Sequence, residues 1–189
     1  FGDEAYAGSR SFYRLVDAVH EVYGYEELIP THQGRGAEHL LSQVCIEPGQ
    51  IVPGNMYFTT TRLHQELAGG TFMDVIIEEA HDPSDMHPFK GDVDLAKLER
   101  VIEEHGAEQI AYISLAGTVN MAGGQPVSMA NVKALRALCD RYGLPIYLDA
   151  TRMMENAYFI QEREEGYADR PVAEILKEFC GYTDGAWMS

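Results

Sequence analysis

The chain has 189 residues, of which 46% are hydrophobic and 23% are charged, as is typical of a globular domain with a hydrophobic core. Its net charge is −16, from 30 acidic and 14 basic residues, and such a surface repels nucleic acids and anionic membranes. No run of about 18 uncharged apolar residues is present, so we expect no membrane-spanning helix.

Hydrophobic periodicity predicts four elements in the first half of the chain. A helix over residues 11–23 ends at Gly24 and carries one apolar stripe. Its members are Phe12, Leu15, Val16, Val19 and Val22. Shorter helices are predicted over residues 37–45 and 61–67, and residues 71–77 are typical of a strand.

The second half alternates between helices and short apolar strands. The predicted elements are a helix at 92–105, a strand at 109–115, a helix at 129–142, a strand at 144–148, and helices at 153–164 and 172–179. This alternation predicts an α/β fold with a mainly parallel sheet flanked by helices. Right-handed crossovers put the carboxyl ends of the strands along one edge, where ligands of such sheets bind.

The most informative local pattern is Asp149-Ala150-Thr151-Arg152, which follows the apolar strand at 144–148. A carboxylate at the end of a buried strand indicates a cationic partner. The protonated ring nitrogen of pyridoxal 5'-phosphate (PLP) is one such partner, because a carboxylate holds that proton by a charge-assisted hydrogen bond. The alternative is an Asp149–Arg152 pair that caps the next helix.

A second pattern, THQGRGAE at residues 31–38, opens a predicted helix. Its glycines allow close approach of the backbone, and the first N–H groups of a helix together with Arg35 favour a phosphate. The spacing is neither that of a Walker loop nor that of a dinucleotide fingerprint. A plain helix start with an exposed Arg35 is the alternative.

Two further segments offer ring-binding and oxygen-binding groups. In NMYFTTTR, residues 55–62, Phe58 is suited to stacking on a heteroaromatic ring and Thr59 to a hydrogen bond with substrate. A core aromatic followed by a threonine N-cap is the alternative there. Asn120 follows the strand at 109–115 and is suited either to a phenolate oxygen or to a turn before Gly123-Gly124.

The histidines and cysteines point to no metal site. The seven histidines lack the spacing of metal ligands, and only His32 adjoins the possible phosphate site. Cys45, Cys139 and Cys180 are widely spaced, which fits buried thiols in a reducing cytoplasm better than a disulfide framework. We therefore expect a cytoplasmic protein.

Taken together, these motifs resemble the β-eliminating lyases of PLP fold type I, a family that includes tyrosine phenol-lyases and tryptophanases. The resemblance runs through nearly the whole chain. It is carried by GDEAYAGSR (2–10), THQGRGAE (31–38), AGGQPVS (122–128) and ENAYFI (155–160). It implies that residues 1–189 are part of the large PLP-binding domain, and that the family's homotetramer shares active sites between subunits.

The resemblance also implies roles for individual residues. Phosphate would be held by Gln33, Gly34, Arg35 and Ser189. Phe58 would stack on the pyridine ring, Asp149 would pair with its nitrogen, and Asn120 with Arg152 would bind its O3' oxygen. Tyr6 would approach the phosphate or act as a general acid, and Glu4 would help to bind potassium or a similar monovalent cation.

One position separates the two activities of the family. After the stacking phenylalanine, tryptophanases carry Asp and tyrosine phenol-lyases carry Thr, and here the residue is Thr59. An uncharged hydroxyl suits the hydroxyl of a phenol, so we expect cleavage of L-tyrosine to phenol, pyruvate and ammonium. Release of indole from L-tryptophan is the alternative, and a non-catalytic α/β binding module is another.

The chain departs from the family in what it lacks. The family's Schiff-base lysine follows a Met-Ser stretch, and this sequence ends at Met188-Ser189, while Lys90, Lys97, Lys133 and Lys177 do not fit that role. The first residue is Phe1 rather than Met, and no secretory signal pattern follows it. We expect a fragment without the N-terminal arm, the lysine segment and the small domain, and without lyase turnover by itself.

Overall fold

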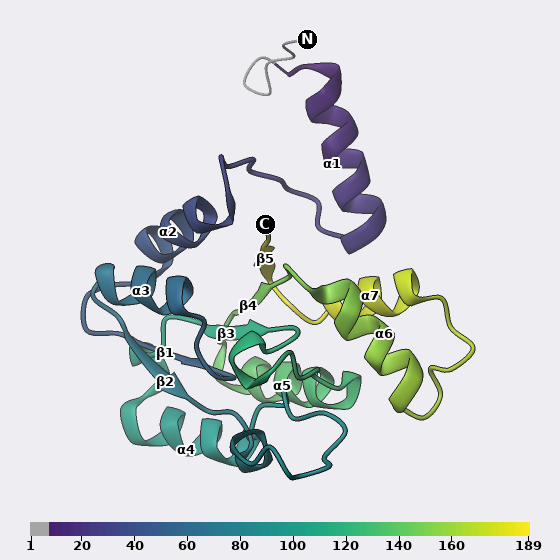
Figure 1. Ribbon diagram of the computed structural model, residues 1–189. Helices are drawn as coiled ribbons and strands as arrows, with labels where there is room; N and C mark the ends of the chain where they lie inside the picture. The colour runs from purple at the N-terminus through teal and green to yellow at the C-terminus, as the bar shows by residue number, and fades with distance from the viewer. Residues whose placement is uncertain (1–7) are drawn as a thin grey trace.

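The computed structural model describes residues 8–189 and has a five-stranded parallel sheet at its centre (Figure 1). The strand order is β2-β1-β3-β4-β5. The strands are β1 (Ile51–Gly54), β2 (Thr71–Asp74), β3 (Ile113–Ala116), β4 (Ile146–Asp149) and β5 (Gly185–Trp187). The predicted α/β fold with a mainly parallel sheet is confirmed.

Helices connect the strands. The α-helices are α1 (Arg10–Tyr23), α2 (Gly34–Cys45), α3 (Thr59–Leu67), α4 (Leu95–His105), α5 (Met129–Tyr142), α6 (Met153–Arg163) and α7 (Val172–Cys180). Short 3₁₀ turns are η2 (Glu78–His81), η3 (Ala107–Gln109) and η4 (Asn120–Ala122). Every predicted helix is present, with ends that differ from the prediction by at most three residues.

Capping residues explain where several helices begin. The Asp94 side chain accepts a hydrogen bond from the Lys97 N–H at 2.9 Å, so α4 starts at residue 95 rather than at 92. The Ser128 hydroxyl caps α5 in the same way, through the Asn131 N–H at 3.0 Å. The apolar periodicity of the sequence located these helices, and the capping side chains determine the residue at which each one begins.

Strands were predicted less well than helices. The strand predicted over residues 71–77 ends at Asp74, whose Oδ1 accepts the N–H of Ile76 at 2.9 Å and turns the chain. The strand predicted over 109–115 begins only at Ile113, because residues 107–109 form η3. Strands β1 and β5 were not predicted at all.

Strand β1 was missed because Pro53 and Gly54 are poor strand residues. The register of β1 with β3 is a single pair, Gly54 with Ser114. The missing N–H of Pro53 therefore removes little hydrogen bonding between these two strands. A Cβ on Gly54 would lie 2.7 Å from the Ser114 carbonyl oxygen, so only glycine fits there. The close approach of β1 to β3 therefore requires glycine at position 54.

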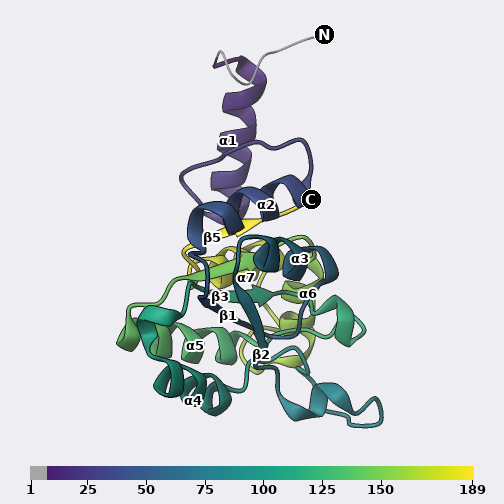
Figure 2. The ribbon, with the colours of Figure 1, turned by 90° about the vertical axis from the view of Figure 1, so that its left-hand side faces the viewer.

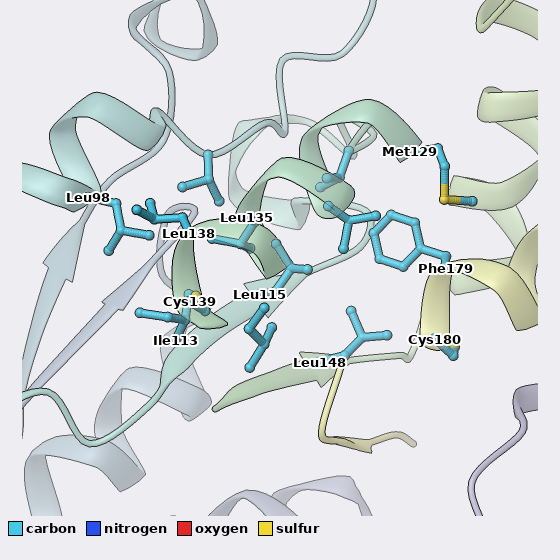
Figure 3. Close-up of a cluster of buried hydrophobic side chains, with 14 of the residues drawn as sticks. Leu98, Ile113, Leu115, Met129, Leu135, Leu138, Cys139, Leu148, Phe179 and Cys180 are labelled. Carbon is cyan, nitrogen blue, oxygen red and sulfur yellow. The ribbon is translucent and has the colours of Figure 1, made fainter. Parts of the chain in front are cut away.

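The main core lies between one face of the sheet and helices α4 to α7 (Figure 3). Leu115 and Leu148 from the strands are fully buried, together with Leu98, Leu135 and Phe179 from the helices. Helices α2 and α3 lie on the other side of the sheet from α4 and α5 (Figure 2). A smaller apolar cluster of Ile46, Val52 and Tyr112 is separate from the main core.

Helix α1 projects away from the sheet (Figures 1 and 2). It has no buried residue, and its apolar stripe is partly exposed, with Leu15 at 46% and Val22 at 37%. Contact with the body is made near its end, where the Tyr25 hydroxyl lies 2.6 Å from that of Thr183. Across residues 8–189, no helix combines the length and the apolar character needed to cross a membrane.

Candidate active site

The carboxyl ends of the strands surround a cavity of about 270 Å³. Parallel pairing brings Ala116 of β3, Asp149 of β4 and Trp187 of β5 to the same edge of the sheet. The residues that line the cavity are Gly34, Arg35, Glu38, Met56, Tyr57, Phe58, Thr60, Ala116, Gly117, Thr118, Val119, Asn120, Asp149, Thr151, Arg152, Trp187 and Ser189. Seven of the predicted site residues are among them.

Asp149 is the last residue of β4 and is half-buried. Its Oδ1 accepts the N–H of Thr151 at 3.1 Å. Burial raises the pKa of Asp149 above its ordinary value, hydrogen bonds with Thr151 oppose that rise, and the nearby carboxylate of Glu38 adds to it. A cation placed against Asp149 would relieve both unfavourable effects.

Arg152 and Asn120 lie side by side in the cavity wall. The Nη1 of Arg152 donates to Oδ1 of Asn120 at 2.9 Å, and its Nε lies 3.7 Å from Oε1 of Glu155. Arg152 therefore pairs with these two residues and not with Asp149, which excludes the helix-capping pair considered from the sequence. Asn120 opens the turn η4, so it is a turn residue that also lines the cavity.

Phe58 is half-buried, lines the cavity and occupies the N-cap position of α3. It is thus not the core aromatic of the alternative interpretation, and no threonine takes the cap position. Thr59 is the first residue of α3 and is exposed, and Thr60 rather than Thr59 lines the cavity. A contact between Thr59 and a substrate stays a prediction.

The N-terminus of α2 closes another side of the cavity. Gly34 is buried against Ser189, and a Cβ on Gly34 would lie only 2.8 Å from the Cβ of Ser189. Arg35 lines the cavity with an exposed side chain. Gln33 is the N-cap of α2 and is exposed, outside the lining residues.

Three buried polar atoms in the cavity wall have no hydrogen-bond partner within the described chain. They are Oε2 of Glu38, Oγ1 of Thr118 and Nε1 of Trp187. Buried polar groups are normally paired, so these atoms indicate that the cavity receives a polar ligand. None of the three was predicted from the sequence as a site residue, although Glu38 belongs to the motif at residues 31–38.

Two predicted site residues, Tyr6 and Glu4, fall outside the described residues. All four lysines lie away from the cavity: Lys97 and Lys133 pair with Glu78 and Glu178, Lys90 donates to the Asp82 carbonyl, and Lys177 packs near Gly24. Over residues 8–189, histidine, cysteine and acidic side chains form no cluster of three or more that could hold a metal.

All three cysteines are free thiols. The prediction that they are buried is confirmed for Cys139 and Cys180 and wrong for Cys45, which is only partly buried. Burial raises the pKa of Cys139 to about 12 and that of Cys180 to about 11, so both thiols stay protonated at neutral pH.

The chain belongs to the β-eliminating lyase family, whose family model matches residues 1–189. It is 66% identical to a tyrosine phenol-lyase of Symbiobacterium thermophilum and 68% identical to one of Intrasporangium calvum, over 188 residues in each case. A tyrosine phenol-lyase of Nostoc punctiforme is 65% identical. Each match covers 100% of this chain and 40% or 41% of the relative, so the chain spans about two fifths of their length.

Solved structures share the fold at low sequence identity. An archaeal alanine:glyoxylate aminotransferase superposes with a TM-score of 0.57 at 21% identity, covering 90% of this chain and 47% of that one. An aspartate aminotransferase of Thermus thermophilus gives 0.57 at 17% identity, covering 74% and 35%. These structures bear out the predicted α/β fold with its mainly parallel sheet.

Proposed function

We propose that the full-length protein is a PLP-dependent lyase that cleaves L-tyrosine to phenol, pyruvate and ammonium. The observation that carries the proposal is that Asp149, Phe58, Asn120 and Arg152 meet around one cavity. The names and the high identity of the relatives support it. The chain spans only part of their length, so the activity belongs to the longer protein.

The residues of the cavity fit PLP. Asp149 offers a carboxylate for a protonated ring nitrogen, Phe58 an aromatic face, and the Asn120–Arg152 pair donors for a phenolic oxygen. The unpartnered atoms of Glu38, Thr118 and Trp187 agree with a polar ligand. When bound, PLP supplies an electron sink for the electrons released at the substrate α-carbon.

The phosphate would lie at the N-terminus of α2. Gly34, Arg35 and Ser189 line that side of the cavity, and Gln33 caps the helix beside them. Free backbone N–H groups and the positive end of the helix dipole favour an anion there. Gly34 keeps the helix and Ser189 close enough to hold the same group.

Two predicted residues act on the substrate. Tyr6 would donate the proton that makes phenol a leaving group, and general acid help of this kind is worth roughly 10²–10⁴-fold. Thr59 would accept or donate a hydrogen bond at the phenol hydroxyl. Thr60, the next residue of α3, lines the cavity, so the first turn of α3 lies beside the cavity.

Other features of the whole protein also stay proposals. We expect residues 1–189 to form part of the large PLP-binding domain, and the complete protein to be a homotetramer. A monovalent cation near Glu4 is expected from the family resemblance alone. A cytoplasmic location is supported by the buried free thiols of Cys139 and Cys180.

The proposal is tested by incubating the full-length protein with PLP and either L-tyrosine or L-tryptophan. Phenol and pyruvate should appear in equal amounts from tyrosine, with far less indole from tryptophan. The T59D variant should lower the ratio of phenol to indole release. The matched control T71D introduces the same charge at the exposed start of strand β2, outside the cavity lining, and should leave that ratio unchanged. Predominant indole release, or no product from either amino acid, would refute the proposed substrate.

A further inference from the structure

Glu38 is the most deeply buried acidic side chain in the cavity wall, with 6% of its surface exposed. It lies in the second turn of α2. Its Oε1 accepts a hydrogen bond from the Thr61 hydroxyl at 2.7 Å, which fixes the carboxylate between α2 and α3. Its Oε2 has no partner within residues 8–189, so half of a buried carboxylate is left without a hydrogen bond.

The charges that line the cavity are arranged unevenly. Glu38 and Asp149 both line the cavity, and the negative charge of Glu38 adds to the rise in the pKa of Asp149 that burial causes. The cationic lining residues are Arg35, which is exposed, and Arg152, which is turned toward Asn120 and Glu155. Two carboxylates therefore line the cavity, and within residues 8–189 neither forms an ion pair with Arg35 or Arg152. Such a pair is costly in a partly buried site unless a bound cation compensates it.

We propose that Glu38 is a positioning residue that acts through Asp149 to favour a protonated, cationic ring nitrogen in the bound cofactor. Thr61 holds the carboxylate of Glu38 in place, and its second negative charge strengthens the attraction for a ring N–H that Asp149 contacts directly. Glu38 thereby raises the proton affinity of the ring without touching the reacting atoms. This inference rests on the proposed PLP cofactor.

The test compares two ligands in the full-length apoprotein: PLP and its 1-deaza analogue, in which carbon replaces the ring nitrogen. The E38Q variant keeps the size of the side chain and removes its charge. We expect its dissociation constant for PLP to rise about tenfold, equivalent to one pKa unit of the ring nitrogen. Its affinity for the deaza analogue should not fall, because that ring carries no proton for Glu38 to stabilise.

A matched control is E47Q, which removes the same charge from an exposed residue just beyond α2. Both ligands should bind E47Q as they bind the unmodified protein. A second readout is the ¹⁵N chemical shift of labelled PLP, which reports protonation of the ring nitrogen directly. In E38Q the ring should lose its proton at lower pH than in the unmodified protein.

Equal weakening of both ligands by E38Q, or no weakening of PLP binding, would overturn the role of Glu38 and leave the proposed lyase function standing. Failure of the unmodified protein to bind PLP would overturn both. If E38Q does not fold, the E38D variant tests the proposal instead. Its side chain keeps the negative charge but is shorter by one methylene, so the charge lies farther from the ring. The ring nitrogen should then lose its proton at lower pH than in the unmodified protein, and an unchanged titration would refute the proposal.

Discussion

Replacing Gly34 by alanine tests whether the close contact between α2 and Ser189 forms part of the cofactor site. The added Cβ would lie 2.8 Å from the Cβ of Ser189 and 3.1 Å from its Oγ. Carbon atoms in good contact lie about 3.5–4.0 Å apart, so the helix and Ser189 must separate by roughly 1 Å. The backbone of Gly34 itself does not resist alanine, because it is helical.

This substitution should affect activity and stability differently. A displacement of about 1 Å at a binding site costs up to roughly 10²-fold in rate, so we expect kcat/KM for tyrosine to fall by ten- to a hundredfold. Alanine is a better helix former than glycine by up to about 1 kcal/mol, which offsets the strain. The thermal stability of the apoprotein should therefore change little while activity and PLP affinity fall.

The assay measures PLP affinity, kcat/KM and the melting temperature of the full-length protein, with G36A as the matched control. Gly36 lies in the same turn, and a Cβ there would meet the His32 ring at 2.6 Å, the end of a side chain that can rotate away. G36A should bind PLP better than G34A does. Unchanged PLP binding in G34A, or equal losses in both variants, would refute the reasoning.

Two more substitutions follow from the carboxylates. D149N should weaken PLP binding by at least about tenfold, because it replaces a charge-assisted hydrogen bond worth roughly 1.5–3 kcal/mol by a neutral one, and equal affinity measured in a PLP titration would contradict this. Burial raises the pKa of Asp92 to about 6, so the folded protein holds the proton of this carboxyl group more tightly than the unfolded chain does. The stability gained in this way is fully present below pH 4 and is lost as the pH rises through 6. The melting temperature of the unmodified protein relative to D92N should therefore decrease between pH 4 and 7, by the equivalent of roughly 3 kcal/mol, and a constant difference would argue against it.

The helices were predictable because their signals are local. The period of apolar residues and a glycine such as Gly24 or Gly143 mark a helix and its end within one segment of chain. The strands β1 and β5 were not predictable in this way. Pro53 and Gly54 are unfavourable in isolation, and their place in the sheet depends on how closely Ser114 approaches.

The candidate site shows the same division. The sequence by itself determined the fold class, the acid at the end of β4 and the family motifs, since each depends on residues adjacent in the chain. Only the tertiary structure decided that Arg152 pairs with Asn120 rather than with Asp149, and that Glu38 and Trp187 share the cavity. Such contacts join segments that are distant in sequence, and their geometry is set by how the strands and helices pack around the sheet.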